Sequence, residues 1–320
     1  MSGKPAFYRD QRAWRDLQNR LPERLRLTDG TAPEEDFWDW RGHRVHLDRY
    51  PKPDAKAKVV LLHGLGTNGR QMSLILGAPL AQMGYETVAP DNLGFGLTQV
   101  KEATTFTYDD WVALVVDFLS HERARDDRPI VLYGQSAGGM LTYHVAAEAP
   151  RGTLAGIVGM AFLDQRDPRV RDETAHDKLT ARVGAPVIER LARTPLAPVK
   201  YPMSLASKMS ALANDPLAMK VFRRDRTSAA SKVSLRFLDA YMNYTPAVEP
   251  EDFDACPVLL TQPAMDRWTP LHLSEPFLAR ITKVPVETVM LDNAGHYPME
   301  EPGLTQMQEA VAGFVAKHTG

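Results

Sequence analysis

The chain has 320 residues, of which 44% are apolar and 24% charged, and its formal net charge is −2. This composition is ordinary for a globular protein, and the absence of a basic stripe excludes an electrostatic footprint for nucleic acid. The single cysteine, Cys256, excludes an internal disulfide framework. No apolar run approaches the ~20 residues of a membrane span, and the charged N-terminus does not resemble a secretory signal. We therefore expect a cytoplasmic protein without a transmembrane segment.

The first fifty residues predict an extension followed by a hairpin. Residues 5–27 space aromatic residues and leucines among basic and acidic ones, which predicts an amphipathic helix, or two helical turns, covering the body of the protein. An interfacial membrane helix is the alternative, although the acidic residues weigh against it. Residues 35–50 then alternate apolar and polar positions around Arg41-Gly42-His43, which predicts a β-hairpin that turns at Gly42.

Further along, short runs of consecutive apolar residues predict strands buried on both faces, as in parallel sheets. They lie at 58–62, 85–90, 128–133, 154–160, 256–261 and 284–291. Helical periodicity separates several of them, at about 70–83, 107–125 and 140–149. Strands that alternate with helices predict an α/β protein with a mostly parallel sheet.

The motif Gly134-Gln135-Ser136-Ala137-Gly138 lies between a predicted buried strand and a predicted helix. A nucleophilic serine presented at such a sharp turn needs glycines beside it, because side chains there would clash. The turn also puts Ser136 at a helix N-terminus, where unpaired N–H groups favour negative charge. We interpret Ser136 as a catalytic nucleophile, whereas a glycine-rich loop without function is the alternative.

Two further candidates follow strands near the end of the chain. Asp266 comes just after the strand at 256–261, in an Asp-x-x-x-Pro setting, and His296 follows the strand at 284–291 in a Gly-His segment before Glu-x-Pro. The order Ser, Asp, His and these flanking patterns resemble the α/β-hydrolase superfamily. Asp164 and Asp292 compete with Asp266 as the acid, since each also lies near a strand end or near His296.

The resemblance implies an α/β-hydrolase fold, with a mostly parallel eight-stranded sheet flanked by helices and a helical cap insert. It assigns Ser136, Asp266 and His296 to a catalytic triad, and the backbone N–H groups of Leu65 and Ala137 to the oxyanion hole. Leu65 follows the His63-Gly64 turn that this family places after its third strand. No cofactor and no metal are expected, because no group of His, Asp or Cys has a recognised metal-ligand spacing.

Residues 164–250 interrupt the pattern with short helical segments, repeated prolines and no predicted strand. They carry fifteen Lys and Arg against ten Asp and Glu, a net charge of +5. Solvated helix faces account for this charge, and attraction of an anionic substrate or membrane surface is the sharper alternative. We expect an N-terminal helical extension at 1–35, a core at 36–163 and 251–320, and a helical cap at 164–250. Segments 203–209 and 214–217 resemble the cap of the monoacylglycerol lipase and lysophospholipase branch.

The expected function is therefore hydrolysis of carboxylic esters by a serine hydrolase, through an acyl-enzyme on Ser136. The substrate is a small-molecule ester, with an acyl lipid as one option, and a peripheral membrane contact stays open. The same triad serves lactonases, including acyl-homoserine lactone hydrolases, C–C bond hydrolases, amidases and proline iminopeptidases. A non-catalytic ligand-binding member of the superfamily is the alternative of another class. Relatives that open epoxides carry an aspartate at the elbow, where this chain has serine.

Overall fold

The computed structural model describes residues 7–177 and 180–320. At its centre lies an eight-stranded sheet in the order β1-β2-β4-β3-β5-β6-β9-β10. The hairpin strands β1 and β2 pair antiparallel, β2 pairs antiparallel with β4, and all other neighbours are parallel. The strands are Glu34–Trp40, His43–Tyr50, Lys58–Leu62, Glu86–Pro90, Ile130–Gly134, Gly156–Gly159, Val258–Pro263 and Val286–Leu291. The expected mostly parallel eight-stranded sheet is confirmed.

Strands at the centre of the sheet are buried along their whole length. Every residue of β3, β4, β5, β6 and β9 is buried, which explains the runs of consecutive apolar residues within them, such as those at 59–62 and 130–133. The outer strand β10 is half exposed. In the β1–β2 hairpin, Arg41 and Gly42 both adopt positive φ, 48° and 83°, as a two-residue type I′ turn requires.

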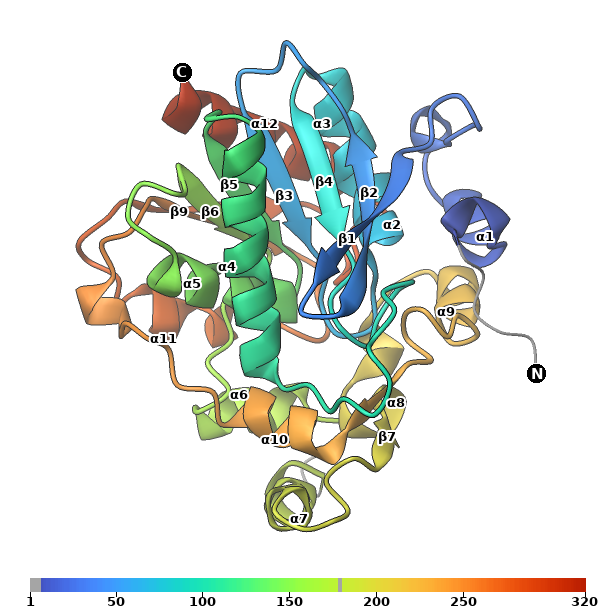
Figure 1. Ribbon diagram of the computed structural model, residues 1–320, viewed down its shortest axis with the longest axis vertical. Helices are drawn as coiled ribbons and strands as arrows, with labels where there is room; N and C mark the ends of the chain where they lie inside the picture. The colour runs from blue at the N-terminus through green and yellow to red at the C-terminus, as the bar shows by residue number, and fades with distance from the viewer. Residues whose placement is uncertain (1–6, 178–179) are drawn as a thin grey trace.

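Helices cover both faces of this sheet (Figure 1). On one face α3 packs against the C-terminal α12, and on the other α4 packs against α5. The helix predicted at about 70–83 is a continuous helical segment, in which a π-helical stretch at Ser73–Gly77 separates α2 from α3. The helices of the core are α2 Gly69–Met72, α3 Ala78–Gln82, α4 Tyr108–Arg125, α5 Ala137–Glu148, α11 Glu275–Leu278 and α12 Gly303–Thr319. None of the helices within the described ranges is long and apolar enough to cross a membrane.

The segment between β6 and β9, residues 164–250, is called the insert below. It lies beyond the sheet edge toward which β3 and β4 point (Figure 1). Its elements are α6 Pro168–Thr174, α7 Ala185–Ala192, β7 Lys200–Pro202, α8 Met203–Ala206, α9 Pro216–Phe222, β8 Lys232–Ser234 and α10 Leu235–Met242. The prediction that the insert has no strand was wrong, because β7 and β8 form a two-stranded antiparallel ribbon. Each has only three residues, too few for an alternating pattern to show.

The segment before β1 is tied to the body by polar contacts. It contains 3₁₀ turns at Tyr8–Asp10 and Glu23–Leu25 and the helix α1 Ala13–Gln18, which packs against α9 of the insert. The Tyr8 hydroxyl donates to Asp91 at 3.0 Å, and Gln11 donates to Thr227 of the insert at 2.8 Å. Trp14, Leu17, Leu21 and Leu25 are buried, so the apolar side chains of the extension face protein.

Candidate active site

Ser136 occupies a strained turn between β5 and α5. Its φ and ψ are 54° and −122°, a conformation that a side-chain-bearing residue rarely adopts. The flanking glycines are needed because the chain passes so close to itself. A Cβ on Gly134 would lie 1.9 Å from the carbonyl oxygen of Gly138, and one on Gly138 would lie 2.5 Å from that of Leu62. The Gly-x-Ser-x-Gly motif therefore forms a sharp strand-to-helix turn of the kind that a nucleophile elbow requires, with Ser136 at the N-terminus of α5.

Asp266 and His296 meet at the ends of the neighbouring strands β9 and β10. The distance from His296 Nδ1 to Asp266 Oδ2 is 2.9 Å, and both side chains are shielded from solvent. The other oxygen, Oδ1, accepts the backbone N–H groups of Trp268 and Thr269 at 2.7 and 2.8 Å. Burial raises the pKa of Asp266, but the His296 charge and these hydrogen bonds outweigh it and lower the pKa to about 2. The carboxylate is thus ionised at neutral pH.

The second imidazole nitrogen of His296 is available for chemistry. Nε2 is buried and has no hydrogen-bond partner within the part of the chain that the structure describes. In the neutral form of the ring, a proton on Nδ1 donates to Asp266, and Nε2 then carries the free lone pair. The Trp268 ring lies beside the imidazole, with centroids 4.7 Å apart, and its indole N–H donates to the carbonyl of Thr174 in the insert at 3.0 Å. The Trp268 side chain thereby contacts both His296 and the insert.

The two competing acids have other partners. Asp164 forms an ion pair with Arg166 at 2.8 Å, and Asp292 accepts from the amide of Gln306 at 2.9 Å. The side-chain partners of His296 Nδ1 are Asp266 and Thr269. Of the three predicted candidates, Asp266 is the one that the structure brings to His296.

The His63-Gly64-Leu65 turn lies directly against the elbow. A Cβ on Gly64 would lie 2.7 Å from the carbonyl oxygen of Gln135 and 3.0 Å from Cβ of Ser136, so only glycine allows this approach. Leu65, Ser136 and Ala137 line one pocket. Ala137 is the first residue of α5, and N–H groups at that position have no acceptor within the helix. The two residues predicted to supply oxyanion donors, Leu65 and Ala137, therefore line the same pocket as Ser136.

His63 has a structural explanation. Its Nδ1 donates to the carbonyl of Gly64 at 2.8 Å, and its Nε2 accepts the backbone N–H of Asn92 at 2.9 Å. Burial lowers the pKa of His63, which keeps the imidazole neutral as this pair of contacts requires. His63 thus fastens the turn after β3 to the loop after β4.

One group of side chains in the described ranges has metal-ligand geometry, namely Glu35, His46 and Asp48. Arg70 already occupies this group, because its guanidinium pairs with Asp48 at 2.5 Å and with Glu35 at 3.3 Å. His46 Nε2 bonds Glu35 at 2.9 Å, and Nδ1 lies 3.3 Å from Asp91, an ion-pair distance without hydrogen-bond geometry. Burial lowers the pKa of His46, but the two carboxylates dominate and raise it to about 9. These residues form a buried ion network rather than an open metal site.

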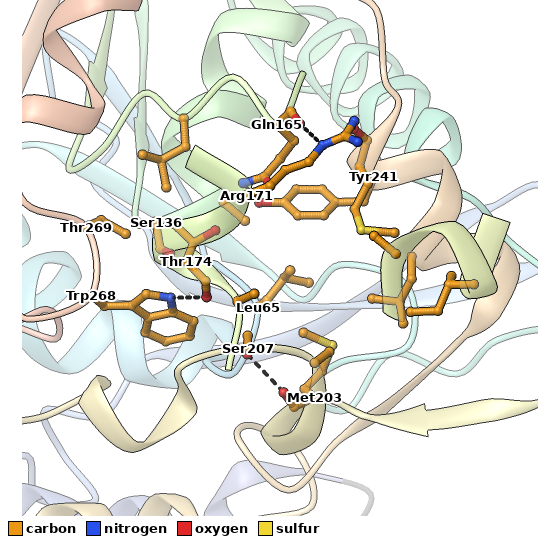
Figure 2. A pocket seen from close by; sticks show the side chains of 18 residues that line it. Leu65, Ser136, Gln165, Arg171, Thr174, Met203, Ser207, Tyr241, Trp268 and Thr269 are labelled. Atoms are coloured by element: carbon orange, nitrogen blue, oxygen red, sulfur yellow. Dashed lines mark hydrogen bonds between the residues drawn. The ribbon is translucent and has the colours of Figure 1, made fainter. Parts of the chain in front are cut away.

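The pocket at Ser136 extends into the insert. It encloses about 780 Å³ of space between atoms, a figure that includes solvent at its mouth. The insert supplies most of its walls, including Ile188, Met203, Leu238 and Met242, while Trp268 and Thr269 border it beside the triad candidates (Figure 2). Its lining is mainly apolar, and the polar side chains of Gln165, Arg171 and Tyr241 gather on the side away from Trp268 (Figure 2).

The methionines and aromatics of the insert only partly serve this pocket. Met203, Tyr241 and Met242 line it. Others pack elsewhere: Met209 lies against Gly66, and Phe237 contacts Trp111 of α4 with ring centroids 4.9 Å apart. Met219, Phe222 and Tyr244 also lie outside the pocket lining.

Three residues of the site were not anticipated from the sequence. Thr269 donates its hydroxyl to Asp266 at 2.7 Å, and Trp268 shields His296. Trp268 and Thr269 could have been found from their position, two and three residues after Asp266. Backbone N–H groups and hydroxyls at that spacing often donate hydrogen bonds to the carboxylate. Arg171 lines the pocket without any such signal in its neighbours.

Ser136 lines the pocket that Trp268 and Thr269 border, and Thr269 also bonds Asp266, but no hydrogen bond joins Ser136 to His296 within the described ranges. A sequence model of the Alpha/beta hydrolase family matches residues 59–312, which is most of the chain, and the chain belongs to that family. No curated protein sequence matches it.

Solved structures with the same fold share little sequence with this chain. The chain is similar to a monoglyceride lipase from Saccharomyces cerevisiae, with 18% identity, 94% of this chain and 99% of that chain covered, and a TM-score of 0.73. A monoacylglycerol lipase from Paleococcus ferrophilus has 16% identity, 86% and 99% coverage and a TM-score of 0.65. Epoxide hydrolase A from Mycobacterium thermoresistibile has 17% identity, 89% and 98% coverage and a TM-score of 0.56. The expected likeness to the monoacylglycerol lipase branch is thus present at the level of the fold.

Proposed function

We propose that this protein is a serine hydrolase that cleaves carboxylic esters through an acyl-enzyme on Ser136. The observation that carries the proposal is the strained elbow at Ser136 combined with the buried Asp266–His296 hydrogen bond of 2.9 Å. Strain at a serine is costly unless the surrounding structure maintains it, and such positions cluster at functional sites. One similar structure is an epoxide hydrolase. We do not propose epoxide opening for this chain, because relatives that open epoxides carry an aspartate at the elbow, whereas residue 136 is a serine.

In the proposed mechanism, Ser136 Oγ attacks the ester carbonyl while His296 Nε2 takes its proton. Asp266 holds the Nδ1–H tautomer and stabilises the imidazolium that forms. The N–H groups of Leu65 and Ala137 hold the negative oxygen of the tetrahedral intermediate, and each such donor is worth ~10²–10³ in turnover. His296 then gives the proton to the departing alcohol. Water, activated by the same imidazole, releases the acid and restores Ser136.

The pocket supports an acyl group of medium or greater length. Its apolar walls come mainly from the insert, which we propose acts as a cap at 164–250 over the core at 36–163 and 251–320. Each buried CH₂ contributes ~0.8 kcal/mol, so an acyl chain that fills the pocket gains affinity at every step. Cys256 offers no second nucleophile, since burial raises the pKa of its thiol to about 12. We place the enzyme in the cytoplasm, where a lone reduced cysteine is ordinary.

A fluorophosphonate probe tests the proposal, because it reacts with activated serines. We expect the wild-type protein to be labelled at Ser136 and to hydrolyse p-nitrophenyl octanoate. Ser136→Ala should lose both labelling and hydrolysis while keeping its circular dichroism spectrum. The matched control is Ser228→Ala, a buried serine of the insert that does not line the pocket. Labelling of Ser136→Ala at the wild-type rate would refute the assignment.

A further inference from the structure

Arg171 is a charged residue in the wall of the pocket that also contains Ser136. It lies on α6 of the insert and is half-buried. In Figure 2 the Arg171 side chain lies with Gln165 and Tyr241 on the side of the pocket away from Trp268 and Thr269. An apolar acyl pocket does not need a guanidinium, and withdrawing one from water is costly unless partners compensate.

The partners of Arg171 are carbonyl oxygens rather than carboxylates. Its Nε donates to the backbone carbonyl of Gln165. Its Nη2 donates to the backbone carbonyl of Met242 at 2.7 Å and to the side-chain oxygen of Asn243 at 3.1 Å. These bonds fix the orientation of the planar group without neutralising its charge. Nη1 makes no hydrogen bond to the residues that the structure describes, and it is not fully buried, so it can still donate to a ligand.

Three other arginines of the insert, Arg166, Arg169 and Arg182, differ from Arg171 in this respect. Arg166 pairs with both Asp164 and Glu249, at 2.8 and 2.6 Å. Arg169 pairs with Glu173 at 3.1 Å and Arg182 with Asp172 at 2.6 Å. Within the described ranges, Arg171 has no carboxylate at ion-pair distance. It is therefore a fixed positive group beside the proposed active site that has no counter-ion of its own.

We propose that Arg171 is an anion-binding subsite, which recognises a carboxylate or phosphate carried by the substrate at a distance from the scissile ester. The proposal rests on the proposed esterase function. An oriented guanidinium suits such oxygens because its donors match their geometry, and a charge-assisted hydrogen bond is stronger than a neutral one. Gln165 and Tyr241, which contact each other at 3.4 Å, add polar groups at the same side of the pocket. The substrate would therefore be an amphiphile with an anionic end, rather than a neutral acyl ester.

Paired substrates test this subsite. On the acyl side, p-nitrophenyl hemiesters of dicarboxylic acids, from succinic to sebacic, are compared with the neutral acyl esters of equal length. On the alcohol side, an octanoyl ester of glycerol phosphate is compared with the octanoyl ester of glycerol. We expect one anionic series to exceed its neutral partner in kcat/KM by about tenfold or more. On the acyl side the preference should peak at one chain length, because Ser136 and Arg171 are fixed relative to each other.

Substitution separates recognition from support of the fold. In Arg171→Gln the ratio of anionic to neutral kcat/KM should fall to about one, while Arg171→Lys should keep part of it. Arg166→Gln is the matched control, because this neighbouring arginine is paired and does not line the pocket; it should keep the ratio. High salt should lower the ratio in the wild-type protein.

Two results would overturn the subsite. One is equal kcat/KM for the anionic and the neutral ester of each pair in the wild-type protein, a measurement that requires no variant. The other is an equal loss for anionic and neutral esters in Arg171→Gln, which would show that Arg171 only supports the end of α10. Either result leaves the esterase proposal standing as long as the neutral esters are hydrolysed in a Ser136-dependent way. If no ester is hydrolysed at all, the proposed function itself fails.

Discussion

Replacing Asp266 by asparagine tests the proposed catalytic geometry most directly, because the contacts of this carboxylate determine how an amide would sit. Oδ1 accepts two backbone N–H groups, from Trp268 and Thr269, at 2.7 and 2.8 Å. An asparagine must put its carbonyl oxygen there, since an NH₂ group would face two donors. Its NH₂ then replaces Oδ2 and points at His296 Nδ1.

The consequence is a reversed tautomer. Facing an NH₂ donor, Nδ1 of His296 becomes the acceptor, so the ring proton moves to Nε2, which can no longer take the proton of Ser136. Loss of the correct tautomer costs ~10⁴ in kcat in triads of this kind. Because asparagine preserves shape and most hydrogen bonds, we expect folding to be kept.

The assay is kcat on p-nitrophenyl octanoate near neutral pH, with the urea midpoint as a control for folding. Asp164→Asn and Asp292→Asn are the matched variants, because each removes one carboxylate with its own partner, Arg166 or Gln306. Both should stay within about tenfold of the wild type, as their partners lie outside the Asp266–His296 pair. If Asp266→Asn keeps a tenth of the activity, or Asp164→Asn or Asp292→Asn falls as far, the geometric reasoning is wrong.

Two further predictions concern stability and chain length. The pKa of His46 is raised to about 9 by Glu35 and Asp91, so its stabilisation is fully present below about pH 6.5, amounts to about 3 kcal/mol and disappears as the pH rises through 9. Urea unfolding of the wild type should show this loss, and His46→Asn should lack it; equal pH dependence in both proteins would contradict the network. In the pocket, kcat/KM should rise about fourfold per CH₂ until the space is filled. Met242→Trp should shorten the preferred acyl chain without lowering acetyl-ester turnover, and equal kcat/KM for acetyl and octanoyl esters in the wild type would dismiss the acyl pocket.

Much of the fold could be predicted because the central strands are buried on both faces. That burial requires consecutive apolar residues, so β3, β5 and β9 are visible in the sequence as runs. The elbow is visible for a different reason: Gly134 and Gly138 are needed where backbone atoms would otherwise collide. A two-stranded ribbon of three residues per strand needs neither an apolar run nor a glycine, which explains why β7 and β8 were missed.

The acid and the histidine of the candidate site could be predicted from the order of the strands, whereas the walls of the pocket depend on tertiary contacts and could not. Asp266 and His296 follow strands that end at one edge of the sheet, so their approach could be expected from topology. The walls of the pocket could not, because helix periodicity in the insert does not reveal which face meets the core. Phe237 and Met242 belong to the same helix, yet Phe237 packs on Trp111 whereas Met242 lines the pocket.

The N-terminal segment sets the practical lower limit for shortening this protein. The family match begins at residue 59, yet Tyr8 bonds Asp91 and Gln11 bonds Thr227. Asp91 also accepts the backbone N–H of Gly69, the first residue of the helix that follows the turn carrying Leu65. A fragment cut at the family boundary would open this buried carboxylate to water and release one support of the proposed oxyanion turn. Libraries, fusions and crystallisation variants are therefore better built on the chain from its N-terminal segment onward than on the residues that the family model matches.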